Sequence, residues 1–158
     1  MSGAESLAAL GLACNVFQMI SFASDVCKAT KMFYESGALD PACARAAQSL
    51  TRVYADIETY TMSHHLTLAE QEAMKIAKDC RETVMILMPE VDRQMASGTK
   101  GSLAKALVAG FQNAITPRLR RVEKFKQQLA AYQKALETRL LFSLWYVHLM
   151  GTERGLRA

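Results

Sequence analysis

The first 24 residues contain the feature that most limits how this chain can fold. Ser6 to Ser24 reads SLAALGLACNVFQMISFAS, a run of 19 residues without a charge, seven of which are Leu, Ile, Val or Phe. As a helix rising about 1.5 Å per residue it would be roughly 28 Å long, close to the roughly 30 Å hydrocarbon core of a bilayer. Polar residues interrupt the run, and each apolar residue gains only about 0.3–0.6 kcal/mol on insertion. The run therefore suits either the core of a helical bundle or a membrane.

The composition indicates a single helical domain spanning residues 1–158. Hydrophobic residues make up 51% of the chain and charged residues 22%, which is typical of a globular protein. Only 8 glycines and 3 prolines interrupt the sequence, so long helices are expected. The four cysteines form no C-x-x-C pair, and the apolar run has no basic segment before it. We therefore expect reduced thiols in an intracellular protein without a secretory signal.

Start and stop signals divide the chain into helices. The first is expected over residues 4–35. A second, over residues 41–61, follows an N-cap at Asp40-Pro41, and a third follows a capping box formed by Thr67 and Glu70 and runs toward residue 95. Pro89 is expected to kink or break this third helix near Met88.

The last third of the chain is expected to add a short helix over residues 103–111 and a long one capped at Thr116-Pro117. The segment LLFSLWYVHLM, residues 140–150, is apolar nearly all round, which predicts burial from several sides. No segment alternates with period two for long enough to form a strand. The predicted fold class is all-α, an antiparallel helical bundle of four long helices plus one short helix.

Charge is distributed unevenly along the chain. Residues 1–99 hold 8 Lys or Arg against 12 Asp or Glu, whereas residues 100–158 hold 11 against 3. The run RLRRVEKFK, residues 118–126, has five cations at the expected start of a helix, where the helix dipole disfavours positive charge. An anionic lipid surface or an acidic protein would compensate for that cost. The alternative is a solvated helix face paired with Glu123 or with acids of the third helix. Nucleic acid is not expected as a partner, because only Phe125 is interleaved among the cations.

The sequence contains no recognisable catalytic or metal-binding motif. In SGTKGS, residues 97–102, Lys100 precedes Gly101 where a phosphate-binding loop has the opposite order, and G-x-S-x-G and H-E-x-x-H are absent. His64 and His65 are expected to be solvated in a polar loop, and His148 to lie in a core or groove. We therefore expect no enzyme activity, no metal and no cofactor.

The opening of the chain resembles that of fungal HeLo-like domains, the N-terminal modules of fungal NLR proteins with NACHT or other STAND-type NTPase domains. The resemblance is carried by residues 7–25, by the charged continuation over residues 28–35, and by residues 119–132 and 136–144 in the final helix. It implies a helical bundle that executes regulated cell death in fungal incompatibility and immunity. It also implies a domain that is cytoplasmic at rest and acts at the plasma membrane on activation.

In that family the first helix is thought to be exposed and inserted when a receptor oligomerises. Carried over by position, residues 1–24 would be the inserting segment, and its apolar residues would be Leu7, Leu10, Leu12, Val16, Phe17, Ile20 and Phe22. On charge alone, the residues expected to contact lipid headgroups are Arg118, Arg120, Arg121, Lys124 and Lys126.

The expected partners are anionic membrane lipids, further copies of the chain, and an NTPase receptor domain in cis or in trans. The alternative interpretation is a non-catalytic protein-interaction or oligomerisation adaptor, which would use residues 140–150 or the basic run as its docking surface.

Overall fold

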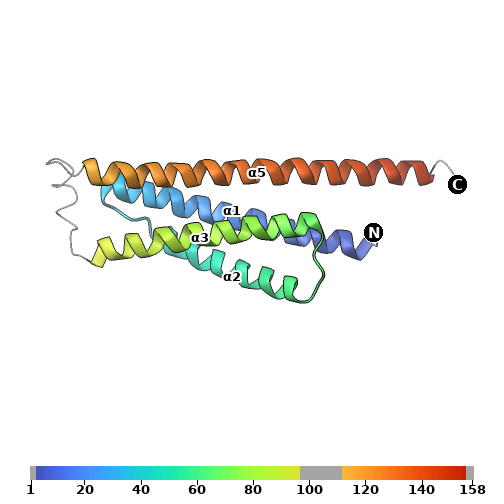
Figure 1. Cartoon of the computed structure of the whole chain (residues 1–158), viewed down its shortest axis with the longest axis horizontal. Coiled ribbons are helices and arrows are strands. Elements are labelled where there is room, and N and C mark those ends of the chain that lie inside the picture. The colour runs from blue at the N-terminus through green and yellow to red at the C-terminus, as the bar shows by residue number, and fades with distance from the viewer. Residues whose placement is uncertain (1–2, 97–111, 156–158) are drawn as a thin grey trace.

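The computed structural model of the 158-residue chain describes the backbone of residues 3–96 and 112–155, and the side chains of residues 9–96, 116–146 and 149. Its described part is all-helical and consists of α1 (Gly3–Ser36), α2 (Ala42–Met62), α3 (Leu68–Ala96) and α5 (Gln112–Gly155). Successive helices run in opposite directions along one long axis (Figure 1). An all-α bundle is therefore confirmed, and the short helix predicted over residues 103–111 lies outside the described residues.

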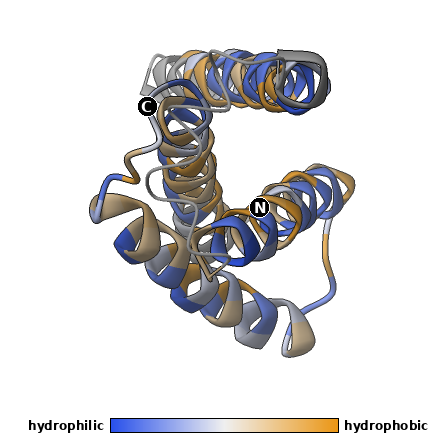
Figure 2. Ribbon diagram, turned by 90° about the vertical axis from the view of Figure 1, so that its left-hand side faces the viewer, coloured by the Kyte–Doolittle hydropathy of each residue, from blue (hydrophilic) through white to orange (hydrophobic). Residues whose placement is uncertain are grey.

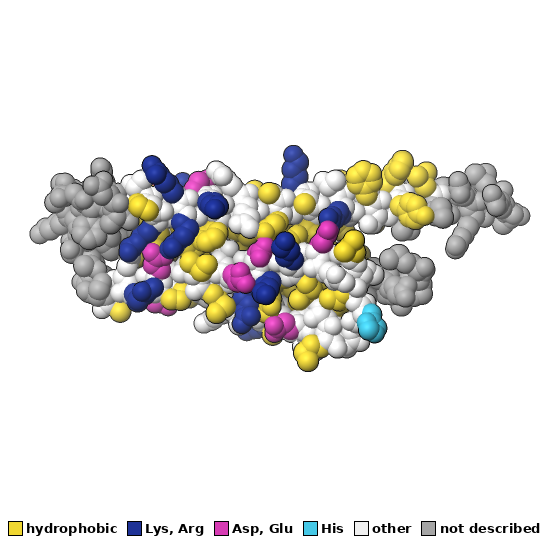
Figure 3. All heavy atoms as spheres, viewed as in Figure 1, with side chains coloured by type: hydrophobic (Ala, Val, Ile, Leu, Met, Phe, Trp, Pro, Cys, Tyr) yellow, Lys and Arg dark blue, Asp and Glu magenta, His cyan; other side chains and the backbone are white. Residues whose placement is uncertain are grey.

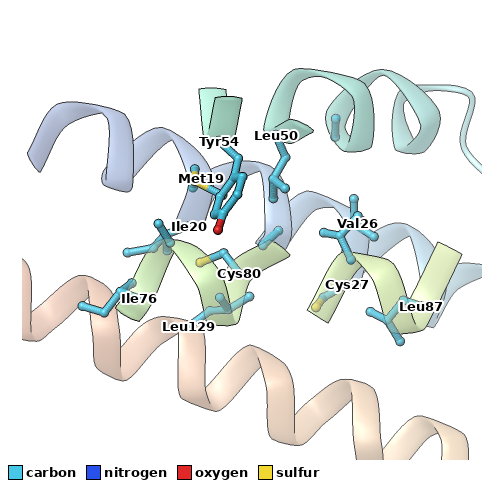
Figure 4. Close-up of a cluster of buried hydrophobic side chains, with 14 of the residues drawn as sticks. Met19, Ile20, Val26, Cys27, Leu50, Tyr54, Ile76, Cys80, Leu87 and Leu129 are labelled. Atoms are coloured by element: carbon cyan, nitrogen blue, oxygen red, sulfur yellow. The ribbon is translucent and has the colours of Figure 1, made fainter. Parts of the chain in front are cut away.

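The first helix is the centre of the bundle. α1 packs against each of the other three helices, and its buried residues extend from Leu12 to Tyr34. Hydrophobic and hydrophilic residues are interleaved along the described helices (Figure 2). Met19 and Ile20 of α1 lie among core side chains from α2, α3 and α5, including Leu50 and Leu129 (Figure 4). The uncharged run at the start of the sequence thus contributes buried side chains to the centre of the core.

Local signals in the sequence end α1 and start α2. Gly37 has a positive φ of 74°, and its amide donates to the Phe33 carbonyl at 2.8 Å, which satisfies one of the free carbonyls at the end of the helix. The Asp40 carboxylate then accepts from the Ala42 amide at 2.8 Å and caps α2, as the sequence predicts.

The predicted capping box at the start of α3 is also confirmed. The Thr67 amide donates to Glu70 Oε2 at 2.7 Å, and the Glu70 amide donates to the Thr67 hydroxyl at 3.3 Å. The Tyr60 hydroxyl donates to the other carboxylate oxygen of Glu70 at 3.1 Å, so the box also ties the end of α2 to the start of α3.

Acid should weaken this box. The hydrogen bond from the Thr67 backbone holds the pKa of Glu70 below its ordinary value of 4.5. Because the folded pKa is depressed, the contribution of the carboxylate to stability is complete above the unfolded value and is lost as the pH falls through the folded value. Glu70→Gln should cost about 0.5–1 kcal/mol at pH 7, since the carboxylate is partly exposed to solvent. Thermal unfolding of both proteins from neutral to acidic pH should show that difference disappear below the folded pKa; a difference that persists in strong acid would contradict this role.

The structure corrects the predictions made at two prolines. Of the kink or break predicted near Met88, the break does not occur, because α3 continues through Pro89 to Ala96. Pro89 is exposed, and so is Met85, whose carbonyl the proline cannot satisfy, so water can take the place of the missing donor. Similarly, α5 begins at Gln112, so Thr116-Pro117 lies within the helix and is not its cap.

Polar contacts fix how α5 lies on α3. Arg139 pairs with Glu72, the Tyr132 hydroxyl donates to Asp79, and Arg121 pairs with Glu90. From Glu72 to Asp79 and then to Glu90, the contacts advance by seven and then 11 residues along α3. Their partners on α5 step back by the same seven and then 11 residues. The two helices therefore keep one antiparallel register.

This register explains why the burial predicted for residues 140–150 is wrong for the side chains that the structure describes there. Four residues before Glu72, α3 begins at Leu68, which is level with Ser143 of α5. Beyond that level α5 has no α3 beside it. The described apolar residues beyond it are exposed: Leu144, Trp145, Tyr146 and Leu149. Leu141 and Phe142, just before that level, are exposed as well, and Leu140 is only partly buried.

Candidate functional site

The candidate inserting residues are mostly locked inside the bundle. Leu12, Val16 and Ile20 are at most 4% exposed, and Phe17 and Phe22 are partly buried against the same core. One described side chain is an exception. Leu10 is 42% exposed, and the side chain of Leu7 lies outside the described residues.

Withdrawing this segment from the core would cost about as much free energy as the unfolding of the whole bundle. Fully burying one large apolar side chain contributes about 1.5–3 kcal/mol, so Leu12, Val16, Met19 and Ile20 together contribute about 6–12 kcal/mol. A domain of this kind is stable by only about 5–15 kcal/mol. Release of residues 1–24 therefore means opening the core, and a membrane or an assembly must supply the compensation.

The basic run of α5 is largely neutralised from within the fold. Glu90 of α3, with a side chain only 15% exposed, accepts from Arg118 Nε at 3.0 Å and also pairs with Arg121. Glu123 lies 3.6 Å from Lys126 and 3.8 Å from Lys31 of α1. Three of the five cations, Arg118, Arg121 and Lys126, thus pair with Glu123 or with the third helix, as the alternative interpretation expected.

The other two cations point to solvent. Arg120 and Lys124 are exposed and form no ion pair within the described chain. Because α5 begins at Gln112, both lie beyond its first turn, where the helix dipole no longer disfavours cations. The electrostatic cost inferred from the sequence is therefore absent, and headgroup contact remains a prediction that rests on these two residues.

The Glu90 cluster also reaches α1. Burial and the nearby Glu90 carboxylate raise the pKa of Tyr34, whose side chain is almost fully buried at the far end of α1 from the inserting residues. The two arginines beside Glu90 lower that pKa in part. Glu90 therefore joins α3 to α5 through ion pairs and lies close enough to α1 to influence Tyr34. Sequence reasoning pointed to acids of the third helix but did not single out this one.

The basic run and the inserting residues lie at different levels of the bundle. The contact of Lys31 with Glu123 places the basic run beside the C-terminal part of α1, roughly 25 Å along the helix axis from the middle of the apolar run. In Figure 3, several Lys and Arg side chains lie toward the end where α5 begins, and a hydrophobic cluster lies at its opposite end. The basic run and the inserting residues can therefore contact the same membrane surface only if the long axis of the bundle lies parallel to the membrane.

The hydrophobic cluster in Figure 3 belongs to the segment for which the sequence predicted burial from several sides and, in the adaptor interpretation, a docking surface. We call it the α5 tip, and its exposed residues are Leu141 (68% exposed), Phe142 (68%), Leu144 (60%), Trp145 (63%), Tyr146 (62%) and Leu149 (42%). The apolar pattern was visible in the sequence, but the end of the neighbouring helix was not. An exposed patch of this kind marks an interaction site.

The histidines and cysteines that the structure describes have structural surroundings. No group of three or more His, Cys, Asp or Glu suited to a metal occurs among them. His64 stacks on Tyr60 and contacts the Tyr60 carbonyl at 3.0 Å, so it supports the end of α2. Burial raises the pKa of the Cys27 and Cys80 thiols to about 12, which keeps them protonated and unreactive.

Comparison with known proteins identifies no relative of the chain. No family model, no curated protein and no solved structure matches the chain. Among the described residues, one stretch, Ala9–Ser36 of α1, is long and apolar enough to cross a membrane by length and composition, a test that the core helix of a soluble bundle also passes.

Proposed function

We propose that this protein is a membrane-targeting cell-death effector domain of the fungal NLR type, which acts by oligomerising and inserting its N-terminal helix. The observation that carries the proposal is that the helix with the length and composition of a membrane span, α1, is also the central helix of the bundle. The resemblance of residues 7–35 and of the final helix to HeLo-like domains supports it. No catalytic side chain is required.

In this mechanism the bundle stores α1 until activation. At rest, the apolar face of α1 is covered by α2, α3 and α5, so the domain stays in the cytoplasm. Oligomerisation with an NTPase receptor domain, or among copies of this chain, offsets the cost of opening the core. Lipid then replaces the protein contacts of Leu12, Val16 and Ile20, while Arg120 and Lys124 contact anionic headgroups at the plasma membrane.

A charge at the centre of the inserting segment tests this mechanism without disturbing the fold. Cys14 is exposed and lies near the middle of the 19-residue uncharged run. Cys14→Asp should fold normally, but the charge costs about 2.5–3.5 kcal/mol at the centre of a membrane helix, which is about 100-fold in the insertion equilibrium. Dye release from liposomes containing anionic lipid should fall accordingly.

Two further variants make the result interpretable. Cys14→Ser separates the effect of charge from the loss of the thiol, and Met85→Asp places the same charge on an exposed apolar site of α3. Both should release dye like the parent protein. Full release by a folded Cys14→Asp variant would end the insertion model. Phe17 is a poorer test site, because it packs against the core and its substitution also perturbs the fold.

The second candidate function is a protein-interaction or oligomerisation adaptor that never enters a membrane. Two observations favour it. The exposed α5 tip offers an apolar docking surface, and the internal pairing of Arg118, Arg121 and Lys126 leaves the basic run less available to lipid. An adaptor stays in the soluble fraction when it is floated with liposomes of any composition. Flotation that requires anionic lipid would exclude this alternative.

A further inference from the structure

Among the residues that the structure describes, none of the bundle covers the α5 tip. Its exposed residues lie around more than half of the helix circumference, because successive residues are separated by 100°. α3 begins at the level of Ser143, so the last turns of α5 extend past it (Figure 1). The exposed surface amounts to on the order of 700 Å², since each aromatic side chain alone offers about 150–250 Å² when fully exposed. That exceeds the largest apolar patch of a typical monomer, roughly 300–600 Å².

We propose that the α5 tip pairs with the α5 tip of a second copy of this chain, in antiparallel orientation. A specific interface buries about 800 Å² per partner, which one tip nearly supplies. The end of the bundle beside the tip adds exposed apolar residues: Leu10 of α1 (42% exposed), Met62 of α2 (91%) and Leu68 of α3 (74%). A partner tip lying along the first tip also reaches this bundle end, which accounts for the wide arc of exposed apolar residues. The surface is then self-complementary, as a two-fold dimer requires.

Charge selects the antiparallel orientation. In a parallel pair, the exposed cations Arg120, Lys124 and Lys134 of one α5 would face the same cations of the other. In an antiparallel pair centred on Trp145, the two basic runs lie at opposite ends of the dimer, roughly 70 Å apart. Two bundles joined tip to tip therefore avoid that repulsion and keep both basic runs exposed.

This inference rests on the oligomerisation part of the proposed function and is independent of membrane insertion. It is therefore tested without lipid, so its failure and the failure of the insertion model are separate results. Sedimentation velocity over a concentration series in lipid-free buffer should show a dimer. Phe142→Glu combined with Trp145→Glu should give a monomer with unchanged helical content, whereas Met85→Glu, on an exposed apolar site of α3, should leave the dimer intact. A monomeric parent protein, or a dimer that survives the double substitution, overturns the proposal.

Crosslinking tests the orientation. In a Cys14→Ser background, a mixture of Leu141→Cys and Leu149→Cys variants should crosslink to each other through a short bis-maleimide, because these positions face one another across an antiparallel pair centred on Trp145. The buried native thiols do not interfere, since burial raises the pKa of all three. In a parallel pair each variant would instead crosslink with itself, which would overturn the proposed orientation. A monomeric parent whose liposome binding is lost on Phe142→Glu with Trp145→Glu would assign the tip to lipid and also overturn it.

Discussion

Truncating Met19 to alanine should lower the free energy of unfolding by about 2–5 kcal/mol, as expected for a fully buried methionine. The cost should lie toward the upper end, because Met19 lies in the helix that all the others pack on and its neighbours cannot close the cavity easily (Figure 4). Urea unfolding followed by circular dichroism measures it. Gln18→Ala, at an exposed neighbouring position, should change the stability by less than about 0.5 kcal/mol.

Met19→Ala also tests how stability is linked to membrane activity. If lipid competes with the core for α1, loosening the core lowers the cost of release. Met19→Ala should then release more dye from liposomes than the parent protein at a temperature where both are folded. Lower stability without any gain in dye release would separate the packing of α1 from membrane activity and so weaken the insertion mechanism.

Replacing Glu90 with glutamine should free the basic run of α5. The variant removes the carboxylate that pairs with Arg118 and Arg121, so we expect a loss of about 1–2 kcal/mol in stability after allowing for the solvent exposure of both arginines. Two additional cations near an anionic surface contribute about 1 kcal/mol each, so binding to anionic vesicles should tighten about 10- to 30-fold.

Glu82→Gln is the control for the change in net charge that Glu90→Gln also causes. Glu82 lies on the same helix, is exposed, and makes no ion pair within the described residues, so Glu82→Gln alters the net charge equally. It should leave stability nearly unchanged and should tighten vesicle binding far less. Equal effects of the two variants on vesicle binding would show that Glu90 does not restrain the arginines.

Much of the fold follows from local patterns in the sequence. Ile57, Leu87 and Val122 recur at helical spacing with other apolar residues, and all three are fully buried. The caps at Asp40 and Thr67 form as predicted, because each needs only a polar side chain within three residues of the amide that it satisfies. Patterns that close within one helix are therefore readable without tertiary information.

The features that were not predicted depend on how helices lie against one another. Nothing local to Trp145 indicates whether a neighbour covers it, since that depends on the level at which α3 begins. The same applies to Glu90. Its pairing with Arg121 requires the antiparallel register between α3 and α5, which spans 31 residues of sequence. The inserting residues pose a related problem, because one apolar stripe satisfies a protein core and a bilayer equally well.

The central position of α1 also has a consequence during synthesis. Among the described helices, α1 is synthesised before the three that pack on it, and α3 is complete only 60 residues after α1 ends. At about 5–20 residues per second, the apolar face of α1 stays uncovered for about 3–12 s in each nascent chain. During that interval a helix with the length and composition of a membrane span is uncovered, so any factor that shields α1 would act before the bundle closes.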